Sequence, residues 1–361
     1  MTTPALLRLR EHFPKAHIAL LTPEKLSDLW LNHPAIDDVI SIPSTANIFS
    51  IGRSLRRGRY DLALVLPNSP RSAMEPWLAG IPRRIGYSRP WRNFFLTKTV
   101  APRFGEVKMH KRSVAEIHRL VSETPDSRSQ TQDPRPKTPS SAHQIYDYLH
   151  LAGILGASAE PLPPRLAVEP AEVTRTRKQF LKDHRGLVFG LNPGAEYGPA
   201  KRWPVERFIA TVNEVQERSD AAWVLFGGKN DATIATQIEA AVFATWERHK
   251  KGPHPMIFNL AGQTSLRELM ALLKSCRVLL TNDTGPMHVA AALGVPVVVP
   301  FGSTSPELTG PISSGAMHHQ IFKADVPCAP CFLRECPIDF RCMKAVRTDE
   351  VAEAVLSMLA K

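Results

Sequence analysis

The stretch Leu279-Leu-Thr-Asn-Asp-Thr-Gly-Pro-Met-His-Val-Ala-Ala-Ala-Leu-Gly294 decides the fold, because an apolar strand runs through a polar turn directly into a helix of small residues. In open α/β sheets a ligand binds at that end of a strand. Thr284 can cap the helix, Gly285 permits close backbone approach, and Pro286 suits the first helical turn because it lacks an N–H group. The free N–H groups and the positive end of the helix dipole would then hold an anion such as a diphosphate.

A second stretch, Phe189-Gly-Leu-Asn-Pro-Gly-Ala-Glu-Tyr-Gly-Pro-Ala-Lys-Arg-Trp-Pro204, ends a strand and opens into a loop rich in Gly and Pro. Its glycines let N–H groups face a phosphate, and Lys201 adds a point charge. Capping alone is the competing explanation for the first stretch, but Asp283 and His288 exceed what a cap requires. For the second stretch, a solvated basic pair at Lys201 and Arg202 is an equal alternative until the two stretches are considered together.

Strands and helices alternate through the second half of the chain, which predicts a doubly wound domain with a parallel sheet. Another strand end, Phe226-Gly-Gly-Lys-Asn-Asp231, is expected on the same face as the two stretches. Ser265-Leu-Arg-Glu268 forms a capping box, which predicts a helix start directly after Thr264. We expect strands at 187–191, 223–226, 256–259, 277–281 and 295–300, and helices at 205–217, 232–246, 266–275, 287–293 and 348–360.

The first half alternates in the same way but begins with a helix. We expect helices at 4–13, 24–32, 48–57, 72–79 and 143–155, and strands at 17–22, 39–42, 61–66 and 84–87. A helix in a parallel sheet normally crosses over from a preceding parallel strand, which this sequence lacks. Without that strand, the sheet should contain buried backbone groups that are unpaired.

Length and composition limit the number of domains and the class of protein. With 361 residues, 43% of them apolar, the chain can bury two ordinary cores, and we expect two α/β domains at 1–165 and 166–361. Residues 121–142 are rich in Ser, Pro, Thr and charge, which predicts a disordered insertion. No apolar run has the length of a membrane span and the first residues do not resemble a signal peptide, so we expect a cytoplasmic protein.

Positive charge dominates, with a net charge of +11 and a pI near 9.6. This balance favours a phosphorylated ligand, an anionic membrane surface or nucleic acid. Nucleic acid is not expected as a partner, because the basic clusters lack interleaved aromatic residues and a recognition helix. The clusters lie in the expected first domain, and solvated helix faces are the alternative explanation for the first: Arg53/Arg56/Arg57/Arg59, Arg83/Arg84/Arg89/Arg92 and Lys108/Lys111/Arg112.

Four of the five cysteines fall within a short segment, at Cys328, Cys331, Cys336 and Cys342. Their C-x2-C-x4-C-x5-C spacing can bring four thiolates around a metal, as a structural zinc site or an iron–sulfur cluster. Zinc is the sharper hypothesis. The alternative is a set of reduced, partly buried thiols in a loop. A catalytic role is not expected, because a metal held by four thiolates has no open position.

The two ligand stretches also carry a family resemblance. Asn192-Pro-Gly-Ala-Glu-Tyr-Gly-Pro-Ala-Lys-Arg-Trp-Pro204 and Thr281-Asn-Asp-Thr-Gly-Pro-Met-His288 resemble the signature stretches of the ADP-heptose lipopolysaccharide heptosyltransferases of glycosyltransferase family 9. Leu66-Pro-Asn-Ser69 and Ala79-Gly-Ile-Pro82 are similar to the heptosyltransferase II subgroup. The resemblance spans nearly the whole chain.

This resemblance implies a GT-B architecture, in which two Rossmann-like, doubly wound domains face a cleft. The domain at 166–361 would bind ADP-L-glycero-D-manno-heptose, and the domain at 1–165 would bind the acceptor. Lys201 would neutralise the donor diphosphate and, with Asp283, is the catalytic candidate. The other implied donor-binding residues line the phosphate and heptose site or lie at neighbouring strand ends: Thr284, Gly285, His288, Asn192, Gly194, Gly228 and Thr264.

The resemblance further implies transfer of heptose, with inversion, to the heptosyl-Kdo2-lipid A inner core at the cytosolic face of the inner membrane. It does not settle whether a divalent ion assists. The family's general base is an Asp in a Gly-Asp pair after the first strand, and Met1-Thr-Thr-Pro-Ala-Leu-Leu-Arg8 matches the residues shortly after that pair. The base is therefore expected to be absent from this chain, either because the reading frame starts earlier or because the protein is a catalytically silent donor-binding relative. A sugar-nucleotide epimerase of GT-B type is a further alternative, which would require acidic residues in the cleft.

Overall fold

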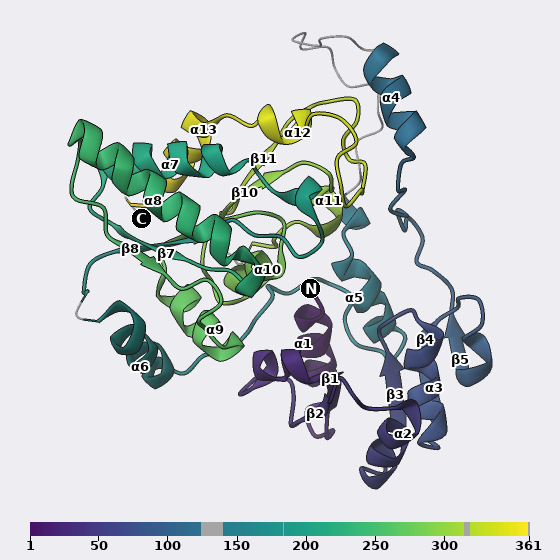
Figure 1. Ribbon diagram of the computed structural model, residues 1–361. Helices are drawn as coiled ribbons and strands as arrows, with labels where there is room; N and C mark the ends of the chain where they lie inside the picture. Colours follow the sequence, from purple (N-terminus) through teal and green to yellow (C-terminus); the bar gives the residue numbers. More distant parts are fainter. Residues whose placement is uncertain (124–139, 183, 314–317, 360–361) are drawn as a thin grey trace. The chain divides into compact units, whose positions relative to one another are not determined.

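The computed structural model describes residues 1–123, 140–182, 184–313 and 318–359, and it consists of two compact units (Figure 1). Unit 1 comprises Met1–Val107 and Ser140–Leu162, and unit 2 comprises Lys108–Pro139 and Pro163–Lys361. Two units were expected, although residues 108–123 were expected in the first. They belong to unit 2 because Ile117, on helix α4 (Val114–Glu123), packs in a buried cluster with Cys328, Cys331 and Leu333.

Unit 2 contains a six-stranded sheet in which every pair of neighbouring strands is parallel, in the order β11-β10-β9-β6-β7-β8. The strands are β6 (Val188–Asn192), β7 (Ala222–Leu225), β8 (Ile257–Asn259), β9 (Val278–Thr281), β10 (Val297–Phe301) and β11 (Gln320–Lys323). The chain moves outward from β6 to β8, then returns to the other side of β6 with β9. The strand order therefore reverses between β6 and β9, which is the topological switch point of a doubly wound sheet.

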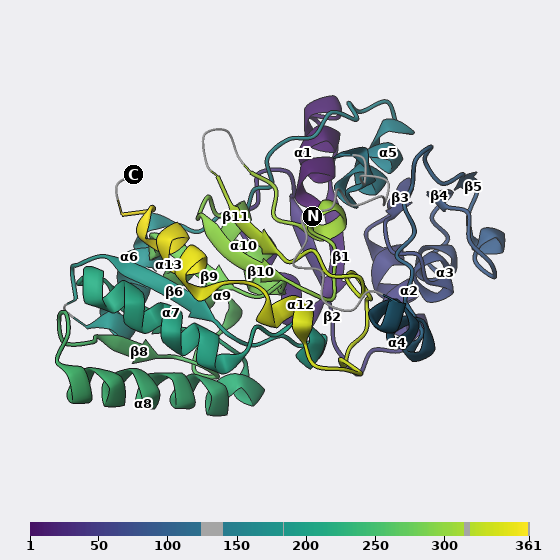
Figure 2. The same cartoon turned by 90° about the horizontal axis from the view of Figure 1, so that it is seen from above.

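Helices cover both faces of this sheet. Figures 1 and 2 show α7, α8 and α13 on one face, and α6 and α9 on the other. Every residue of β6, β7, β9 and β10 is buried, as expected for a parallel sheet with two covered faces. The helices and short 3₁₀ turns of unit 2 are α4, α6 (Pro170–Leu181), η4 (Pro199–Lys201), α7 (Val205–Arg218), η5 (Lys229–Asp231), α8 (Ala232–His249), α9 (Leu266–Ser275), α10 (Gly285–Ala292), α11 (Pro306–Thr309), α12 (Arg341–Lys344) and α13 (Thr348–Leu356).

Unit 1 contains two separate parallel sheets. One pairs β1 (Ala19–Pro23) with β2 (Asp38–Ile42), and the other has the order β3 (Leu62–Val65), β4 (Arg83–Tyr87), β5 (Lys98–Val100). Among the described residues, β1 and β3 are not neighbours in a sheet. The helices are α1 (Thr3–His12), η1 (Glu24–Trp30), α2 (Ile48–Arg57), α3 (Pro70–Leu78), η2 (Asn93–Phe95), η3 (Ser140–Ala142) and α5 (Ile145–Gly153).

Two expectations about local structure need correction. The segment expected to be an α-helix at 24–32 is the 3₁₀ helix η1, which buries none of its residues. The expected disordered insertion at 121–142 is ordered at both ends, because α4 continues to Glu123 and η3 begins at Ser140; its remaining residues lie outside the described part of the chain. Charge and proline content did not show where the neighbouring helices begin and end.

Candidate active site

The two predicted ligand stretches meet at the switch point of the unit 2 sheet. Asn192, the last residue of β6, lies opposite Thr281, the last residue of β9, in the strand register. The Asn192 Nδ2 donates to Thr281 Oγ1 at 3.2 Å and to Thr284 Oγ1 at 3.4 Å. Open α/β sheets bind ligands at the carboxyl ends of the strands around such a point, and the strand order in the sheet brings these two stretches to one site.

A partly buried ion pair joins the same two stretches. Lys201 Nζ lies 2.7 Å from Asp283 Oδ2, and the two side chains are 16% and 5% exposed. Thr304 Oγ1 donates to the same carboxylate oxygen, also at 2.7 Å. The alternative of a solvated basic pair at Lys201 and Arg202 is therefore wrong for Lys201. Its ammonium is held at the end of the sheet by a carboxylate that a hydroxyl group also orients.

Sequence reasoning missed Thr304, although a signal was present. Thr304 follows β10 in the run Gly302-Ser-Thr-Ser305, and Ser303, Thr304 and Ser305 are all buried. Three small hydroxyl residues directly after an apolar strand are typical of a strand end that faces a polar site. β10 is the neighbour of β9 in the sheet, so this run reaches the edge at which Asp283 lies.

A second buried polar residue fixes the loop that carries Lys201. Asn282 Oδ1 accepts a hydrogen bond from the backbone N–H of Trp203 at 2.9 Å, and its Nδ2 donates to the carbonyl oxygen of Pro193 at 2.7 Å. Asn282 and Trp203 are both fully buried. This amide satisfies backbone groups of the loop from within the turn, so it holds Lys201 beside Asp283.

The capping role expected for Thr284 is not found in the turn that leads into α10. Thr284 occupies the N-cap position, but its side chain makes no capping hydrogen bond; its hydroxyl group instead lies 3.2 Å from that of Thr281. The N–H groups at the start of α10 are therefore not satisfied by Thr284. A Cβ atom at Gly285 would meet no atom within 4 Å, so open space adjoins this first turn. His288 lies further along the same helix and is half-buried.

The remaining predicted donor-binding residues, Gly194, Gly228 and Thr264, are linked less directly to the Lys201–Asp283 ion pair. Gly194 packs against the Asp231 carboxylate, which a Cβ atom at position 194 would approach to 2.3 Å, and Gly228 donates its N–H to Asp231 Oδ2 at 3.0 Å. Asp231 also lies 3.9 Å from Arg202. Thr264 follows β8, and within the described ranges no hydrogen bond connects it to Lys201 or Asp283. The capping box at Ser265 is confirmed.

Tyr197 is a further residue of this site that the sequence did not single out. Lys201 Nζ lies 5.0 Å from the centre of its ring, and the guanidinium of Arg334 lies 5.6 Å from the same ring. The Tyr197 hydroxyl group donates to the carbonyl oxygen of Phe332 at 2.8 Å, which fixes the ring. Two cations near one aromatic ring add positive potential beside the ion pair.

The four clustered cysteines come together but form no recognised metal centre. All four line one cavity of about 10 Å³, and each has a free thiol. Burial raises the pKa of Cys328 and Cys331, and raises that of Cys342 to about 12. In the part of the chain that the structure describes, no group of three or more His, Cys, Asp or Glu side chains is arranged to hold a metal ion. Metal binding at these cysteines stays a prediction.

In unit 1, the second basic cluster is divided among different partners. Arg89 forms an ion pair with Glu106 at 2.8 Å. Arg92 is fully buried and donates from Nη1 to Asn68 Oδ1 at 3.1 Å, while its Nε and Nη2 have no hydrogen-bond partner among the described residues. Burial lowers the pKa of Arg92. Because Asn68 belongs to the Leu66–Ser69 stretch, that stretch and the basic cluster meet at the carboxyl end of β3.

A membrane-spanning helix is not found in the part of the chain that the structure describes.

Comparison with known proteins connects this geometry to a family. The lipooligosaccharide heptosyltransferase 2 of Haemophilus ducreyi is 33% identical over 323 residues, which are 86% of this chain and 81% of that protein. The lipopolysaccharide heptosyltransferase 2 of Escherichia coli is 31% identical over 338 residues, covering 88% and 85% of the two chains.

Solved structures agree with the sequence comparison. The E. coli ADP-heptose lipopolysaccharide heptosyltransferase II matches with a TM-score of 0.74 at 27% identity, over 99% of this chain and 94% of that chain. A glycosyltransferase family 9 structure from Veillonella parvula has a TM-score of 0.72 at 21% identity, over 99% and 92% of the two chains, and confirms the fold. The predicted GT-B class is therefore confirmed. The model of glycosyltransferase family 9 (heptosyltransferase) matches residues 48–135 and 126–340, and the chain belongs to that family.

Proposed function

We propose that this protein transfers heptose from ADP-L-glycero-D-manno-heptose to the heptosyl-Kdo2-lipid A inner core of lipopolysaccharide. The observation that carries the proposal is the Lys201–Asp283 ion pair, which lies at the switch point beside the uncapped start of α10. The names of the relatives support the donor and the kind of acceptor, since the E. coli structure is that of an ADP-heptose lipopolysaccharide heptosyltransferase II.

The donor diphosphate would bind where positive charge and free N–H groups converge. The first turn of α10 provides N–H donors and the positive end of a helix dipole, and open space adjoins Gly285. Lys201 provides a cation whose position is fixed by Asp283, so little reorganisation is needed when charge develops on the leaving group. Asn192, Gly194, Gly228, Thr264 and His288 complete the proposed donor site around the neighbouring strand ends.

The proposed reaction inverts the configuration at the anomeric carbon of heptose. An acceptor hydroxyl group attacks that carbon, the bond to the phosphate oxygen breaks, and the electron pair leaves with ADP. Lys201 and the α10 N–H groups would stabilise this departing diphosphate. The acceptor hydroxyl group loses its proton as it attacks, and a general base takes up that proton.

The proposed acceptor is supported by the positive charge of the chain and by the names of its relatives. The net charge of +11 would favour association with a phosphate-rich lipopolysaccharide core at the inner face of the inner membrane. Arg92 is buried beside Asn68, and its Nε and Nη2 have no hydrogen-bond partner among the described residues, which makes it our candidate for an acceptor anion. The alternative of a catalytically silent relative has no support from the comparisons, because the relatives are named as transferases over more than four fifths of this chain.

The test is a transfer assay with ADP-heptose and purified heptosyl-Kdo2-lipid A. We expect release of ADP together with a gain of one heptose in the mass of the acceptor. Lys201→Met should greatly reduce ADP-heptose binding and turnover, whereas the matched variant Lys178→Met, on an exposed position of α6, should not. Failure of the unsubstituted protein to bind ADP-heptose would overturn the proposal, and conversion of a sugar nucleotide without acceptor would favour an epimerase.

A further inference from the structure

Large aromatic side chains are exposed around β5, the edge strand of the β3-β4-β5 sheet of unit 1. Trp91 and Phe94 lie in the loop between β4 and β5, and Phe104 lies in the loop that follows β5. Trp91 is 89% exposed, Phe94 is 79% exposed, and Phe104 is not covered at all. A folded protein normally buries much of each such ring, so three exposed rings in two loops mark a surface that binds a partner.

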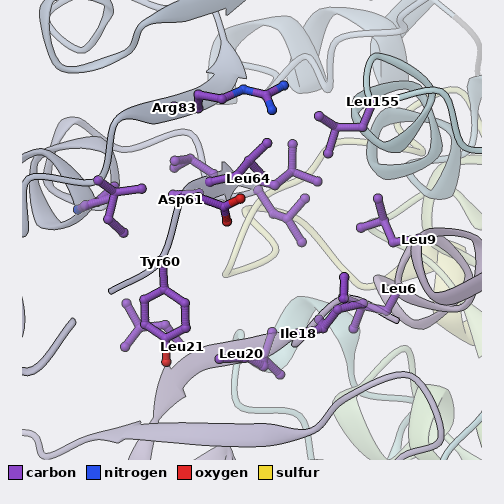
Figure 3. A pocket seen from close by; sticks show the side chains of 18 of the residues that line it. Leu6, Leu9, Ile18, Leu20, Leu21, Tyr60, Asp61, Leu64, Arg83 and Leu155 are labelled. Carbon is purple, nitrogen blue, oxygen red and sulfur yellow. The ribbon is translucent and has the colours of Figure 1, made fainter. Parts of the chain in front are cut away.

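The apolar side chains in the interior of unit 1 are a separate group. Figure 3 shows Leu6, Leu20 and Leu64 directed toward one another around a cavity between α1, β1 and β3. Among the described residues that line this cavity, none is one of the three exposed aromatic residues. These aromatic residues therefore form an outward surface and do not extend the core.

The two loops form one continuous surface. Arg89, in the first loop, forms an ion pair with Glu106, in the second, at 2.8 Å. Trp91 lies two residues after Arg89 and Phe104 lies two residues before Glu106, so the Cα atom of each ring residue is within about 7 Å of the Cα atom of its ion-pair residue.

Helix α3 adds a fourth aromatic side chain to this surface. Trp77, in the last turn of α3, is 39% exposed, and the centre of its ring lies 6.2 Å from that of Phe94. We call the four residues Trp77, Trp91, Phe94 and Phe104 the aromatic rim.

Hydrogen bonds hold the loop between β4 and β5 so that its rings face outward. Arg92, which lies between the two exposed rings in sequence, is fully buried and donates to Asn68. Asn93 Oδ1 accepts a hydrogen bond from the backbone N–H of Arg89 at 3.1 Å. Trp91 has a φ of 62°, a left-handed conformation that is rare for a bulky residue and persists only where its surroundings fix it. The rim is thus a fixed feature of the loop.

Positive charge surrounds the aromatic rim. The segment 77–107 contains a single acidic residue, Glu106, which is already paired with Arg89. Arg83 and Lys98 are exposed on the same sheet, at β4 and at β5. The six basic residues of the segment are Arg83, Arg84, Arg89, Arg92, Lys98 and Arg103. The charge of this surface is therefore complementary to that of an anionic partner.

An anionic phospholipid bilayer fits both properties of the surface. Trp and Phe rings insert at the level of the headgroups, while Lys and Arg are attracted to the phosphates of the same layer. A fluid bilayer can surround separate protruding rings without a matching shape. A protein partner would need complementary pockets, and single-stranded nucleic acid is usually stacked in a basic groove, which rings as exposed as Trp91 and Phe104 do not form.

We propose that the aromatic rim inserts into the headgroup region of an anionic phospholipid bilayer, with the surrounding basic residues against the lipid phosphates. The choice of a bilayer over other anionic surfaces rests also on the proposed function, whose acceptor is a lipid. Vesicle binding requires neither ADP-heptose nor acceptor, so it can be measured separately. A chain that binds vesicles but transfers no heptose would retain the rim and lose the proposed function, and the opposite result would do the reverse.

The test measures flotation of the full chain with vesicles of phosphatidylethanolamine and phosphatidylglycerol, and with vesicles of phosphatidylcholine alone. Trp91→Asn with Phe94→Asn should weaken binding to the anionic vesicles at least about tenfold, because two rings no longer leave water; Asn also tolerates the left-handed conformation at position 91. Lys98→Gln should weaken it about fivefold, and added salt should weaken it further.

A matched control is Phe49→Asn, which should leave vesicle binding unchanged. Phe49 is 72% exposed on α2, whose buried residues pack with residues of β1, β2 and β3 rather than β5. Equal thermal unfolding midpoints would show that the variants are folded. Heptose transfer should fall in the double variant when the acceptor is embedded in vesicles, and should stay unchanged when the acceptor is dissolved in detergent.

A spectroscopic measurement distinguishes insertion from attraction by charge alone. Brominated phosphatidylglycerol should quench part of the tryptophan fluorescence of the unsubstituted chain, and Trp91→Phe should remove most of that quenching while the chain still binds. Equal vesicle binding by the double variant would overturn the proposal, as would equal binding to neutral and anionic vesicles. So would a dimer that the double variant loses, or binding of a single-stranded oligonucleotide that it loses while vesicle binding is kept.

Discussion

The Lys201–Asp283 ion pair allows stability and donor binding to be separated by three variants: Lys201→Met, Asp283→Asn and the double substitution. At 2.7 Å, the attraction between the two charges is about 6 kcal/mol at an effective dielectric constant of about 20. Much of it is cancelled by the cost of taking both groups out of water. Breaking such a pair by removing one partner nevertheless costs about 3–5 kcal/mol, because the other charge stays buried.

The single variants should differ in stability because the partners differ in exposure. Lys201→Met leaves the Asp283 carboxylate, 5% exposed, with the hydroxyl group of Thr304 as a partner, so its loss should lie near the upper end of that range. Asp283→Asn leaves Lys201, whose side chain is 16% exposed and can reach water, and the loss should be smaller. The double variant buries no unpaired charge and should recover most of the stability.

Donor binding should follow a different order, because it needs the cation itself. Urea unfolding gives the stability of each variant, and calorimetric titration with ADP-heptose gives its affinity. We expect the double variant to be nearly as stable as the unsubstituted chain but to bind ADP-heptose as weakly as Lys201→Met. A double variant as unstable as Lys201→Met would refute the ion-pair reasoning. A stable double variant with unchanged affinity would remove Lys201 from the donor site.

Three further predictions concern unit 2. Ser265→Ala removes the capping box of α9 and should lower the free energy of unfolding by about 1 kcal/mol, measured by urea unfolding. Hydrogen bonds from Arg267 lower the pKa of Glu172 below its usual 4.5, so Glu172→Gln should reduce the free energy of unfolding above pH 4.5. The difference from the unsubstituted chain should vanish as the pH falls through the lower pKa of the folded state. Equal differences at pH 3 and pH 7 would contradict this. Burial raises the pKa of Cys342 to about 12, so roughly one thiol in 10⁴ is ionised at pH 8. Alkylation of Cys342 in the folded protein should therefore be about a thousandfold slower than that of an ordinary thiol. The measurement is mass spectrometry after labelling, and rapid labelling of Cys342 would contradict its burial.

The parts of the fold that the sequence predicted are those with a clear burial pattern. The core strands of unit 2 are buried at every residue, and their apolar runs indicated them directly. Two of the missed elements lack such a pattern: α6 buries only Thr176 and Leu181, and β11 alternates half-buried and exposed residues at an edge of the sheet. Such elements are stabilised by their neighbours, which a local pattern does not contain.

The site was predictable in its members but not in its pairing. Lys201 and Asp283 were each identified from their own turns, yet the ion pair between them depends on the order of strands in the sheet, which places β6 beside β9. The same order brings Thr304 to Asp283 from the end of β10. For Thr284, local chemistry suggested a cap, but the neighbouring hydroxyl and amide groups of Thr281 and Asn192 now contact its side chain instead.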